Sequence, residues 1–324
     1  MAGLVSHPVE PHANTLFDRL ATRRLLVVSG KGGVGRTSVA ALLGAALADR
    51  GKRVLVATTG HDDRLAWMLG APRLGDQPQA VTERLFIQRL EPQTCIREYG
   101  GLVLHSTRVS SAVFDNRVIR KLMRAIPGLD DFAVVGKAWH EAIRGGQYDT
   151  VVFDGPATGH LLFALDVPLA ILNTVPKGPL TKEAELMQAS FEDPSRVEAV
   201  LVGLPETWPL TELVELGEAL RERIRMSVAA IMVNGLWPED FAEFAEMADL
   251  PPGLGEVGRV GAVGRQQRES IASWQASDVV RRCATSSLLT LPWQWGGLPH
   301  LEAVRAWLGQ ARAAALHGGS QSVE

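Results

Sequence analysis

Cysteine is scarce in this chain of 324 residues, which contains only two. Cys95 and Cys283 lie far apart in the sequence and no C-x-x-C pair occurs. The chain therefore has neither the spacing of a zinc site nor the cysteine density of a disulfide framework. Two buried, reduced thiols are the simpler interpretation, and they indicate a reducing compartment.

Long apolar runs and excess positive charge are also missing. Residues 1–22 carry Glu10 and Asp18 and do not resemble a signal peptide. The longest later apolar run, 161–172, contains Asp166 and is too short to span a bilayer. The net charge of −3 gives no basic field that would favour nucleic acid. We therefore expect a cytoplasmic protein with no nucleic-acid partner and no membrane span, and peripheral membrane contact stays open.

Short apolar runs alternate with helical patterns along the chain. Strands that are apolar on both faces belong in a parallel sheet covered on both sides, so the alternation predicts a doubly wound α/β fold. An amphipathic pattern over 298–316 predicts a final helix. The seven expected strands are 24–30, 53–59, 84–90, 150–155, 198–204, 227–234 and 286–292.

The domain organisation follows from where these patterns begin and end. We expect a weakly structured N-terminal extension over 1–22, a main domain over 23–314 and a flexible tail over 315–324. Within the main domain, about 91–147 and 157–192 are helical in pattern, with prolines marking breaks in the second stretch. These helices either form a cap beyond the carboxyl edge of the sheet or simply cover the sheet, and both alternatives stay open.

A glycine-rich turn follows the first expected strand and precedes a small-residue helix. Its sequence matches G-x-x-x-x-G-K-[ST], except that Arg36 stands at the lysine position. Glycines allow backbone N–H groups to curl around a phosphate, the helix N-terminus favours an anion, and the Thr37 hydroxyl is suited to Mg²⁺. The pattern predicts nucleotide binding, against the alternative of a turn for another anion or for none. The expected contacts are Gly30, Gly32, Gly33, Val34, Gly35, Arg36, Thr37 and Ser38.

A second motif, D-G-P-A-T-G-H, begins at the end of the fourth expected strand with Asp154. A carboxylate in that place suits the Walker-B role, close to a hydrated Mg²⁺. Thr37 and Asp154 are therefore the expected metal-side residues.

The loop also has Lys31 directly after its first glycine, and G-K-G-G-V-G-R-T-S resembles the deviant Walker A motif. That motif is found in septum-positioning and plasmid-partition ATPases, the nitrogenase iron protein, and the arsenite-pump and tail-anchored-protein-targeting ATPases. The resemblance implies a P-loop NTPase fold with ATP and Mg²⁺ as ligands. It also implies that Lys31 reaches the nucleotide of a partner subunit, in a homodimer or in a heterodimer with a paralogous ATPase.

Other segments resemble the arsenite-pump and targeting branch more closely. D-G-P-A-T-G-H, 154–160, is similar to its second switch and makes His160 a switch residue, although Gly155 departs from the usual Thr or Ala. Residues 126–141 and 177–187 resemble a bacterial sub-branch that often occurs as paired paralogues. VNG and LPW near the end of the chain look like the strand ends that hold adenine. By that resemblance Asn234 bonds the base edge, and Pro292 and Trp293 pack on the base.

Two departures from the family pattern both affect the hydrolysis of ATP. The position of the water-activating Asp in the first switch holds Gly60. Asp62 either replaces that base or belongs to the acidic start of the next helix, and both interpretations stay open. Arg36 keeps a positive charge but is larger than lysine, so binding can survive while transition-state fit is lost. The candidate catalytic residues are Lys31, Arg36, Asp154 and Asp62.

Two functions fit this sequence. The first is a dimeric ATPase of the arsenite-pump and targeting type, whose slow hydrolysis is coupled to movement of the second switch and the helical cap. The second is a non-hydrolysing, nucleotide-binding subunit of a heterodimer with an intact paralogue. The client is an unidentified protein or anion. Two distant cysteines disfavour a thiolate arsenite site, and two methionines in the cap stretches disfavour a groove for hydrophobic tails.

Overall fold

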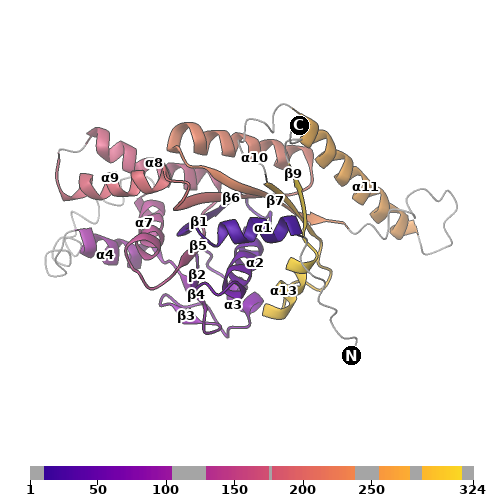
Figure 1. The fold of residues 1–324 in the computed structure, drawn as a ribbon, viewed down its shortest axis with the longest axis horizontal. Coiled ribbons are helices and arrows are strands. Elements are labelled where there is room, and N and C mark those ends of the chain that lie inside the picture. Colours follow the sequence, from indigo (N-terminus) through magenta and orange to yellow (C-terminus); the bar gives the residue numbers. More distant parts are fainter. Residues whose placement is uncertain (1–10, 104–128, 175–176, 238–254, 278–286, 316–324) are drawn as a thin grey trace, which may run out of the picture.

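The computed structural model describes residues 11–103, 129–174, 177–237, 255–277 and 287–315 (Figure 1). Cys283, Met123 and residues 104–128 of the expected helical stretch 91–147 lie outside these ranges. All statements below concern the described residues.

The centre of the molecule is one sheet of nine strands in the order β3-β4-β2-β5-β1-β6-β7-β8-β9. The seven expected strands are present and pair in parallel, which confirms the predicted α/β fold. Two short strands that the sequence did not indicate, β3 and β9, pair antiparallel at the edges. The strands are β1 (Leu25–Ser29), β2 (Val54–Thr58), β3 (Gln79–Ala80), β4 (Leu85–Arg89), β5 (Thr150–Asp154), β6 (Val197–Gly203), β7 (Val228–Leu236), β8 (Ser287–Pro292) and β9 (Arg312–Ala315).

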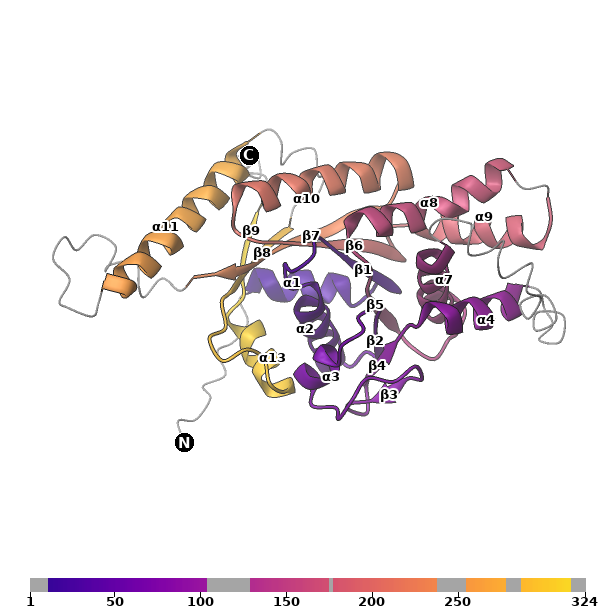
Figure 2. The ribbon, with the colours of Figure 1, turned by 180° about the vertical axis from the view of Figure 1, so that it is seen from behind.

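Helices cover both faces of the sheet (Figures 1 and 2), and the buried side chains of β1 point alternately to the two faces. Leu25 and Val27 belong to one hydrophobic cluster, and Leu26 and Val28 belong to the other. The second cluster includes α1 (Pro11–Leu20), α2 (Arg36–Asp49), α3 (Arg64–Leu69) and α13 (Leu301–Gly309). The first includes α4 (Pro92–Val103), α7 (Leu129–Ile143), α8 (Thr158–Thr174), α9 (Pro179–Phe191), α10 (Thr207–Ala219) with its π-helical end η1 (Leu220–Ile224), and α11 (Gly255–Ala276).

The helices α4, α7, α8 and α9 gather at one end of the molecule (Figure 1). Trp139, Leu165 and Phe191 from three of them are fully buried in the cluster on the first face of the sheet. These helices thus cover the sheet with their inner sides. Pro168 lies inside α8, so the expectation that it breaks the helical stretch is wrong. A proline removes only one helical N–H, and the apolar side of α8 remains anchored in the core.

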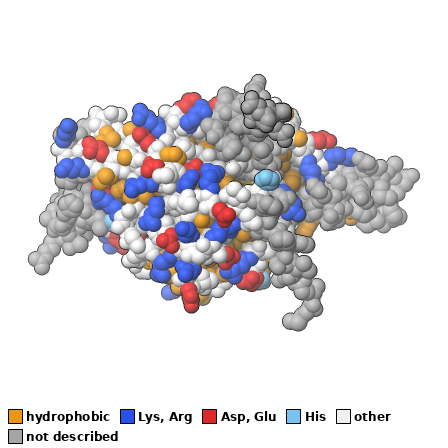
Figure 3. Space-filling view, viewed as in Figure 1, with side chains coloured by type: hydrophobic (Ala, Val, Ile, Leu, Met, Phe, Trp, Pro, Cys, Tyr) orange, Lys and Arg blue, Asp and Glu red, His pale blue; other side chains and the backbone are white. Residues whose placement is uncertain are grey.

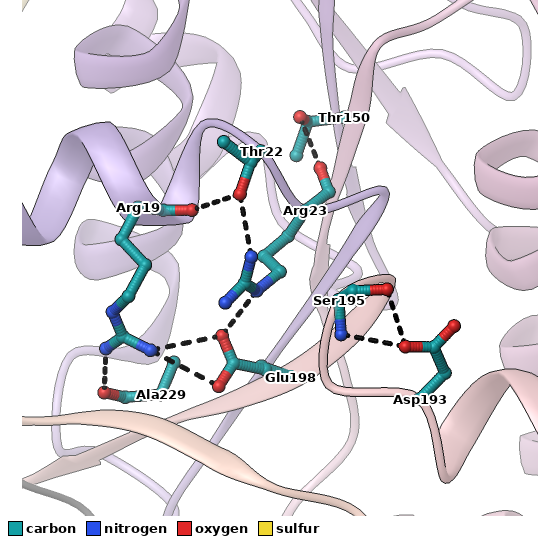
Figure 4. A network of polar contacts seen from close by, with 8 residues as sticks. All are labelled: Arg19, Thr22, Arg23, Thr150, Asp193, Ser195, Glu198 and Ala229. Atoms are coloured by element: carbon teal, nitrogen blue, oxygen red, sulfur yellow. Dashed lines mark hydrogen bonds and ion pairs between the residues drawn. The ribbon is translucent and has the colours of Figure 1, made fainter.

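Residues 11–20 are also better ordered than expected. Residues 11–20 form α1, whose Phe17 and Leu20 are fully buried. An ion cluster fastens the segment that leads from α1 into β1 (Figure 4). The buried carboxylate of Glu198 on β6 accepts from Arg23 Nε at 2.6 Å and from Arg19 Nη1 at 3.3 Å. Arg19 Nη2 also donates to the Ala229 carbonyl at 2.6 Å, so the segment is tied to both β6 and β7.

The final helix is shorter than its sequence pattern. It ends at Gly309, and Arg312–Ala315 then pair antiparallel with β8 as β9. The pattern over 298–316 therefore predicted a helix where the last four described residues form a strand. The cause is tertiary, because β8 would otherwise present unpaired backbone groups at an open sheet edge.

The surface and the helices show two further features. None of the helices in the described ranges is both long enough and apolar enough to cross a bilayer. On the face shown in Figure 3, basic and acidic side chains lie interspersed. A mixed pattern of this kind gives no large field of one sign.

Candidate nucleotide site

The glycine-rich loop joins β1 to the N-terminus of α2, where the sequence placed it. Gly35 occupies the position before α2 with φ +92°, a conformation that favours glycine. A Cβ atom there would lie 2.1 Å from Asn234 Nδ2, and one on Gly30 would lie 2.1 Å from the Val202 carbonyl oxygen. The loop thus fits closely against the ends of β6 and β7, and only glycine satisfies these contacts.

The two expected metal-side residues lie together. Thr37 Oγ1 donates to Asp154 Oδ2 at 2.7 Å, and Thr58 Oγ1 donates to the same oxygen at 2.8 Å. Thr58 Oγ1 in turn accepts from the Gly60 N–H at 3.0 Å. One carboxylate oxygen therefore links the phosphate loop to the first residues after β2. Thr58 was not predicted as a site residue, although parallel pairing sets it beside Asp154 where both strands end.

The Asp154 carboxylate is buried, with 4% of the residue exposed. Burial raises the pKa of Asp154, while the hydroxyls of Thr37 and Thr58 and the charge of Arg36 oppose that rise. The buried carboxylate has lost its hydration, and its neighbours are neutral donors and one nearby cation. A further cation would therefore strongly stabilise its charged form. The hydroxyl and carboxylate therefore fit a hydrated Mg²⁺, which this fold class holds through those two groups.

Arg36, at the start of α2, faces the second switch. Its Nη1 donates to the carbonyl oxygen of Gly155, the residue directly after Asp154. Gly155 is itself buried, and a Cβ there would lie 2.8 Å from Phe153 Cε1. The two residues that depart from the family pattern in the loop and in the second switch are therefore in contact with each other.

Lys31 stands on the open side of the loop. Its Nζ lies 2.7 Å from Glu212 Oε1 of α10, with 61% of the lysine side chain exposed. An exposed pair of this kind adds little to stability. Lys31 is thus held within its own chain by a weak contact and remains accessible from outside.

The loop after β2 is fastened to the sheet by Arg89, the last residue of β4. Arg89 donates to the carbonyl oxygens of Gly60 and Asp62 at 3.2 and 3.3 Å and to Asp63 Oδ1 at 3.0 Å. The exposed Asp62 side chain accepts from the Arg64 N–H at 3.2 Å, at the start of α3. This contact gives Asp62 a local structural role, and its role as a catalytic base stays a prediction.

A pocket of about 370 Å³ opens beside the loop. It is lined by four expected residues, Ser38, Asn234, Pro292 and Trp293. Asn234 Nδ2 donates to the Val34 carbonyl at 2.9 Å, so its amide nitrogen is committed to the loop. The remaining lining residues were not predicted, and no pattern in the chain marks them. They are Arg64, Trp67, Met68, Gln294, Gly297, Leu298 and Trp307.

Aromatic side chains form the walls of this pocket. Trp67 is 51% exposed and Trp293 is 47% exposed, although both line a hollow. The Trp293 ring stacks on Trp237, with centroids 6.1 Å apart and planes within 4°. Trp307 Nε1 donates to the Pro292 carbonyl at 2.9 Å and fixes that wall. Half-exposed, rigid aromatic faces beside a phosphate loop suit a planar base.

The second switch also contacts the neighbouring helices. His160 in the first turn of α8 lies 2.8 Å from Asp131 Oδ2 of α7, measured from its Nδ1. The imidazole is largely exposed. Elsewhere in the helices, Cys95 is buried and burial raises the pKa of its thiol to about 12, as expected for an unreactive cysteine. Within the described residues no group of three or more His, Cys, Asp or Glu side chains is arranged to hold a metal ion.

Several known ATPases are similar in sequence to this chain. The chain is 29% identical over 239 residues to a putative arsenical pump-driving ATPase of Halobacterium salinarum, covering 68% of this chain and 36% of the relative. It is 27% identical over 240 residues to ATPase BagA of Mycobacterium tuberculosis (69% and 70% covered) and 29% identical over 206 residues to ATPase GET3 of Kluyveromyces lactis (59% and 58% covered). The chain spans about a third of the length of the arsenical pump-driving relatives. Residues 23–184, half of the chain, match the family described as anion-transporting ATPase, and this chain belongs to that ATPase family.

Proposed function

We propose that this chain binds ATP–Mg²⁺ on the loop from Gly30 to Ser38 and hydrolyses ATP slowly as a dimer. The observation that carries the proposal is the Thr37–Asp154–Thr58 cluster at the mouth of the loop. It joins the Mg²⁺-side hydroxyl, a buried carboxylate and the first switch within hydrogen-bond distance. The adjacent aromatic pocket supplies a place for the base.

Each residue has a distinct role in this proposal. The loop N–H groups and the N-terminus of α2 bind phosphate oxygens, and Arg36 adds a positive charge there. Thr37 would hold the Mg²⁺, and Asp154 would orient water around it. The ion, when bound, neutralises charge on the phosphates. Lys31 leaves Glu212 and contacts the nucleotide of the partner subunit, either a second copy or a paralogue. Asp62 remains the candidate for orienting the attacking water.

A second function has its own supporting observations. Gly60 provides no carboxylate in the first switch, and Lys31 is paired within its own chain. Both features suit a subunit that binds nucleotide without hydrolysing it and depends on an intact paralogue. We place hydrolysis first because Thr37, Lys31 and Asp154 are all retained. The client, a protein or an anion, is not specified by either function.

The test combines ATP turnover with oligomeric mass. We expect the purified chain to release phosphate at below about 1 s⁻¹, compared with a median of ~10 s⁻¹ for enzymes. ATP–Mg²⁺ should shift the mass from monomer toward dimer in sedimentation. Lys31→Ala should abolish turnover without changing the thermal midpoint, because its ion pair is exposed.

Lys52→Ala, just past the far end of α2, is the matched control and should turn over ATP normally. ATP binding without any phosphate release, together with activity regained on adding a paralogue, would establish the second function. Absence of ATP binding to the wild type and to Arg36→Lys alike would contradict both functions.

The base pocket gives a separate prediction. Trp67→Ala and Trp293→Ala should each weaken ATP binding about fivefold, since one stacked base contact contributes roughly 1 kcal/mol or more. Isothermal titration with ATP–Mg²⁺ measures the loss. Trp208→Ala is the control, because Trp208 on α10 is 79% exposed and lies outside the pocket. Equal affinity of all four proteins would mean that the base lies elsewhere.

A further inference from the structure

The guanidinium of Arg36 connects two elements that are 119 residues apart in sequence. One is the phosphate loop, since Arg36 begins α2 directly after Gly35. The other is the second switch, since the acceptor is the carbonyl oxygen of Gly155 at the end of β5. The charge of Arg36 also acts on the adjacent Asp154 carboxylate. A displacement of this guanidinium would therefore act directly on Gly155 of the second switch.

The Gly155 backbone is placed to use this donor. Gly155 is buried against Phe153 and Leu161. The next residue, Pro156, has no backbone N–H. A buried carbonyl requires a partner, and Arg36 supplies one. α8 begins two residues after Pro156, at Thr158. The bond thus fixes the backbone just before the helix that carries His160.

An arginine can do here what a lysine cannot. A guanidinium presents five N–H donors on three nitrogens in a rigid fork, whereas an ammonium has all its donors on one nitrogen. Nη1 is the nitrogen that bonds Gly155, so the guanidinium keeps its Nε and Nη2 donors for phosphate oxygens. A lysine would need the carbonyl and the phosphate within reach of one atom.

We propose that Arg36 is a positioning residue that couples phosphate on the loop to the second switch, holding the Gly155 carbonyl with one nitrogen and the nucleotide phosphates with the others. This inference rests on the proposed nucleotide binding and specifies how it acts on residues 155–163. The Lys→Arg departure is then a functional feature of this chain. The terminal phosphate of ATP draws the guanidinium and with it the start of α8, and ADP does so less.

Hydrogen exchange of the full chain tests the coupling in two steps. Without nucleotide, Arg36→Lys and Arg36→Met should each speed exchange over 155–163 about tenfold, the equivalent of one lost hydrogen bond from a charged donor. Protection of β6 (Val197–Gly203) should remain, which shows that the variants fold. Arg24→Lys is the matched control, because Arg24 also donates to backbone carbonyls, but at the opposite end of β1. It should leave 155–163 unchanged.

In the second step a non-hydrolysable ATP analogue with Mg²⁺ is compared with ADP–Mg²⁺. In the wild type the analogue should protect 155–163 more than ADP does, and in Arg36→Lys this difference should vanish while residues 30–38 stay protected. Residues 30–38 could be protected in both proteins while the difference between the analogue and ADP at 155–163 is the same in Arg36→Lys as in the wild type. That result would overturn the coupling and leave the proposed nucleotide binding intact. Absence of protection at 30–38 in the wild type would overturn the proposed function and the coupling with it. Unchanged exchange in the first step would show that the Arg36–Gly155 contact does not hold the switch.

Discussion

Asp154→Asn is expected to weaken Mg²⁺-dependent ATP turnover about 100-fold, as loss of a residue that supports a metal ion commonly does. The same variant is expected to unfold at a higher temperature than the wild type when no nucleotide is present. Both effects have one cause, which is the burial of a charged carboxylate that only a bound cation compensates fully. The two measurements are phosphate release at fixed Mg²⁺ and a thermal unfolding scan without ligand.

The direction of the stability change follows from the pKa of Asp154. Burial raises this pKa in the folded chain above the ordinary value for an aspartate, so the unfolded chain releases the proton first as pH rises. Between those two pKa values the folded state binds more protons, and stability therefore falls as pH rises through that window. Above it the penalty is constant. Asparagine carries no charge, so the variant escapes the penalty at neutral pH.

Asp193→Asn provides a control of opposite sign. The Asp193 side chain is 40% exposed, and hydrogen bonds from the Ser195 hydroxyl and N–H lower its pKa. A lowered pKa stabilises the fold above the unfolded-state value, and that stabilisation is lost at acid pH. Asp193→Asn should therefore gain no stability at neutral pH. A thermal midpoint for Asp154→Asn at or below that of the wild type would contradict the assignment of a strained, charged Asp154.

Glu198→Ala is expected to lower the free energy of unfolding by about 3 kcal/mol, because it leaves Arg19 and Arg23 without their shared carboxylate. The Glu198 side chain is only 5% exposed, and that of Arg23 is 15% exposed. A partly buried guanidinium that loses its carboxylate partner keeps an unpaired charge away from water. An exposed guanidinium that loses its partner is hydrated instead. Denaturant titration measures the change, and the thermal midpoint should fall by roughly 5–10 °C.

Glu256→Ala is the matched control for this prediction. Glu256 pairs with Arg259 on α11, and both side chains are about three-quarters exposed. Such a pair contributes about 0–1 kcal/mol, so the variant should unfold almost as the wild type does. If Glu198→Ala also unfolded like the wild type, α1 and the segment into β1 would be held by apolar contacts alone, mainly those of Phe17 and Leu20.

Much of this fold could be predicted from local patterns in the sequence. The seven parallel strands are apolar on both faces, and that property is visible without tertiary information. The loop and Asp154 were found because their geometry requires fixed residue types at fixed spacing. α1 was not expected, because its Phe17 and Leu20 are sparse among polar residues and are buried only against α2 and the sheet. β9 was missed because a helical pattern continued through it and only the edge of β8 overrides that pattern.

The site shows the same division between local and tertiary information. Thr37 and Asp154 follow from motifs, whereas Trp67 reaches the pocket because α3 packs on α2 and α13. That packing brings together residues separated by more than 200 positions. The contact between Arg36 and Gly155 is equally long-range, so the sequence marked each residue as unusual but not their pairing.

Arg89 gives the first switch loop a fixed frame of reference. The arginine is the last residue of β4, and its bonds to Gly60, Asp62 and Asp63 tie the loop to the sheet. We therefore expect a spectroscopic label at the exposed His61 to stay fixed relative to the sheet. A second label could be placed at the exposed Gly159, where a side chain meets open space. A change in the distance between the two labels would then report movement of the second switch alone.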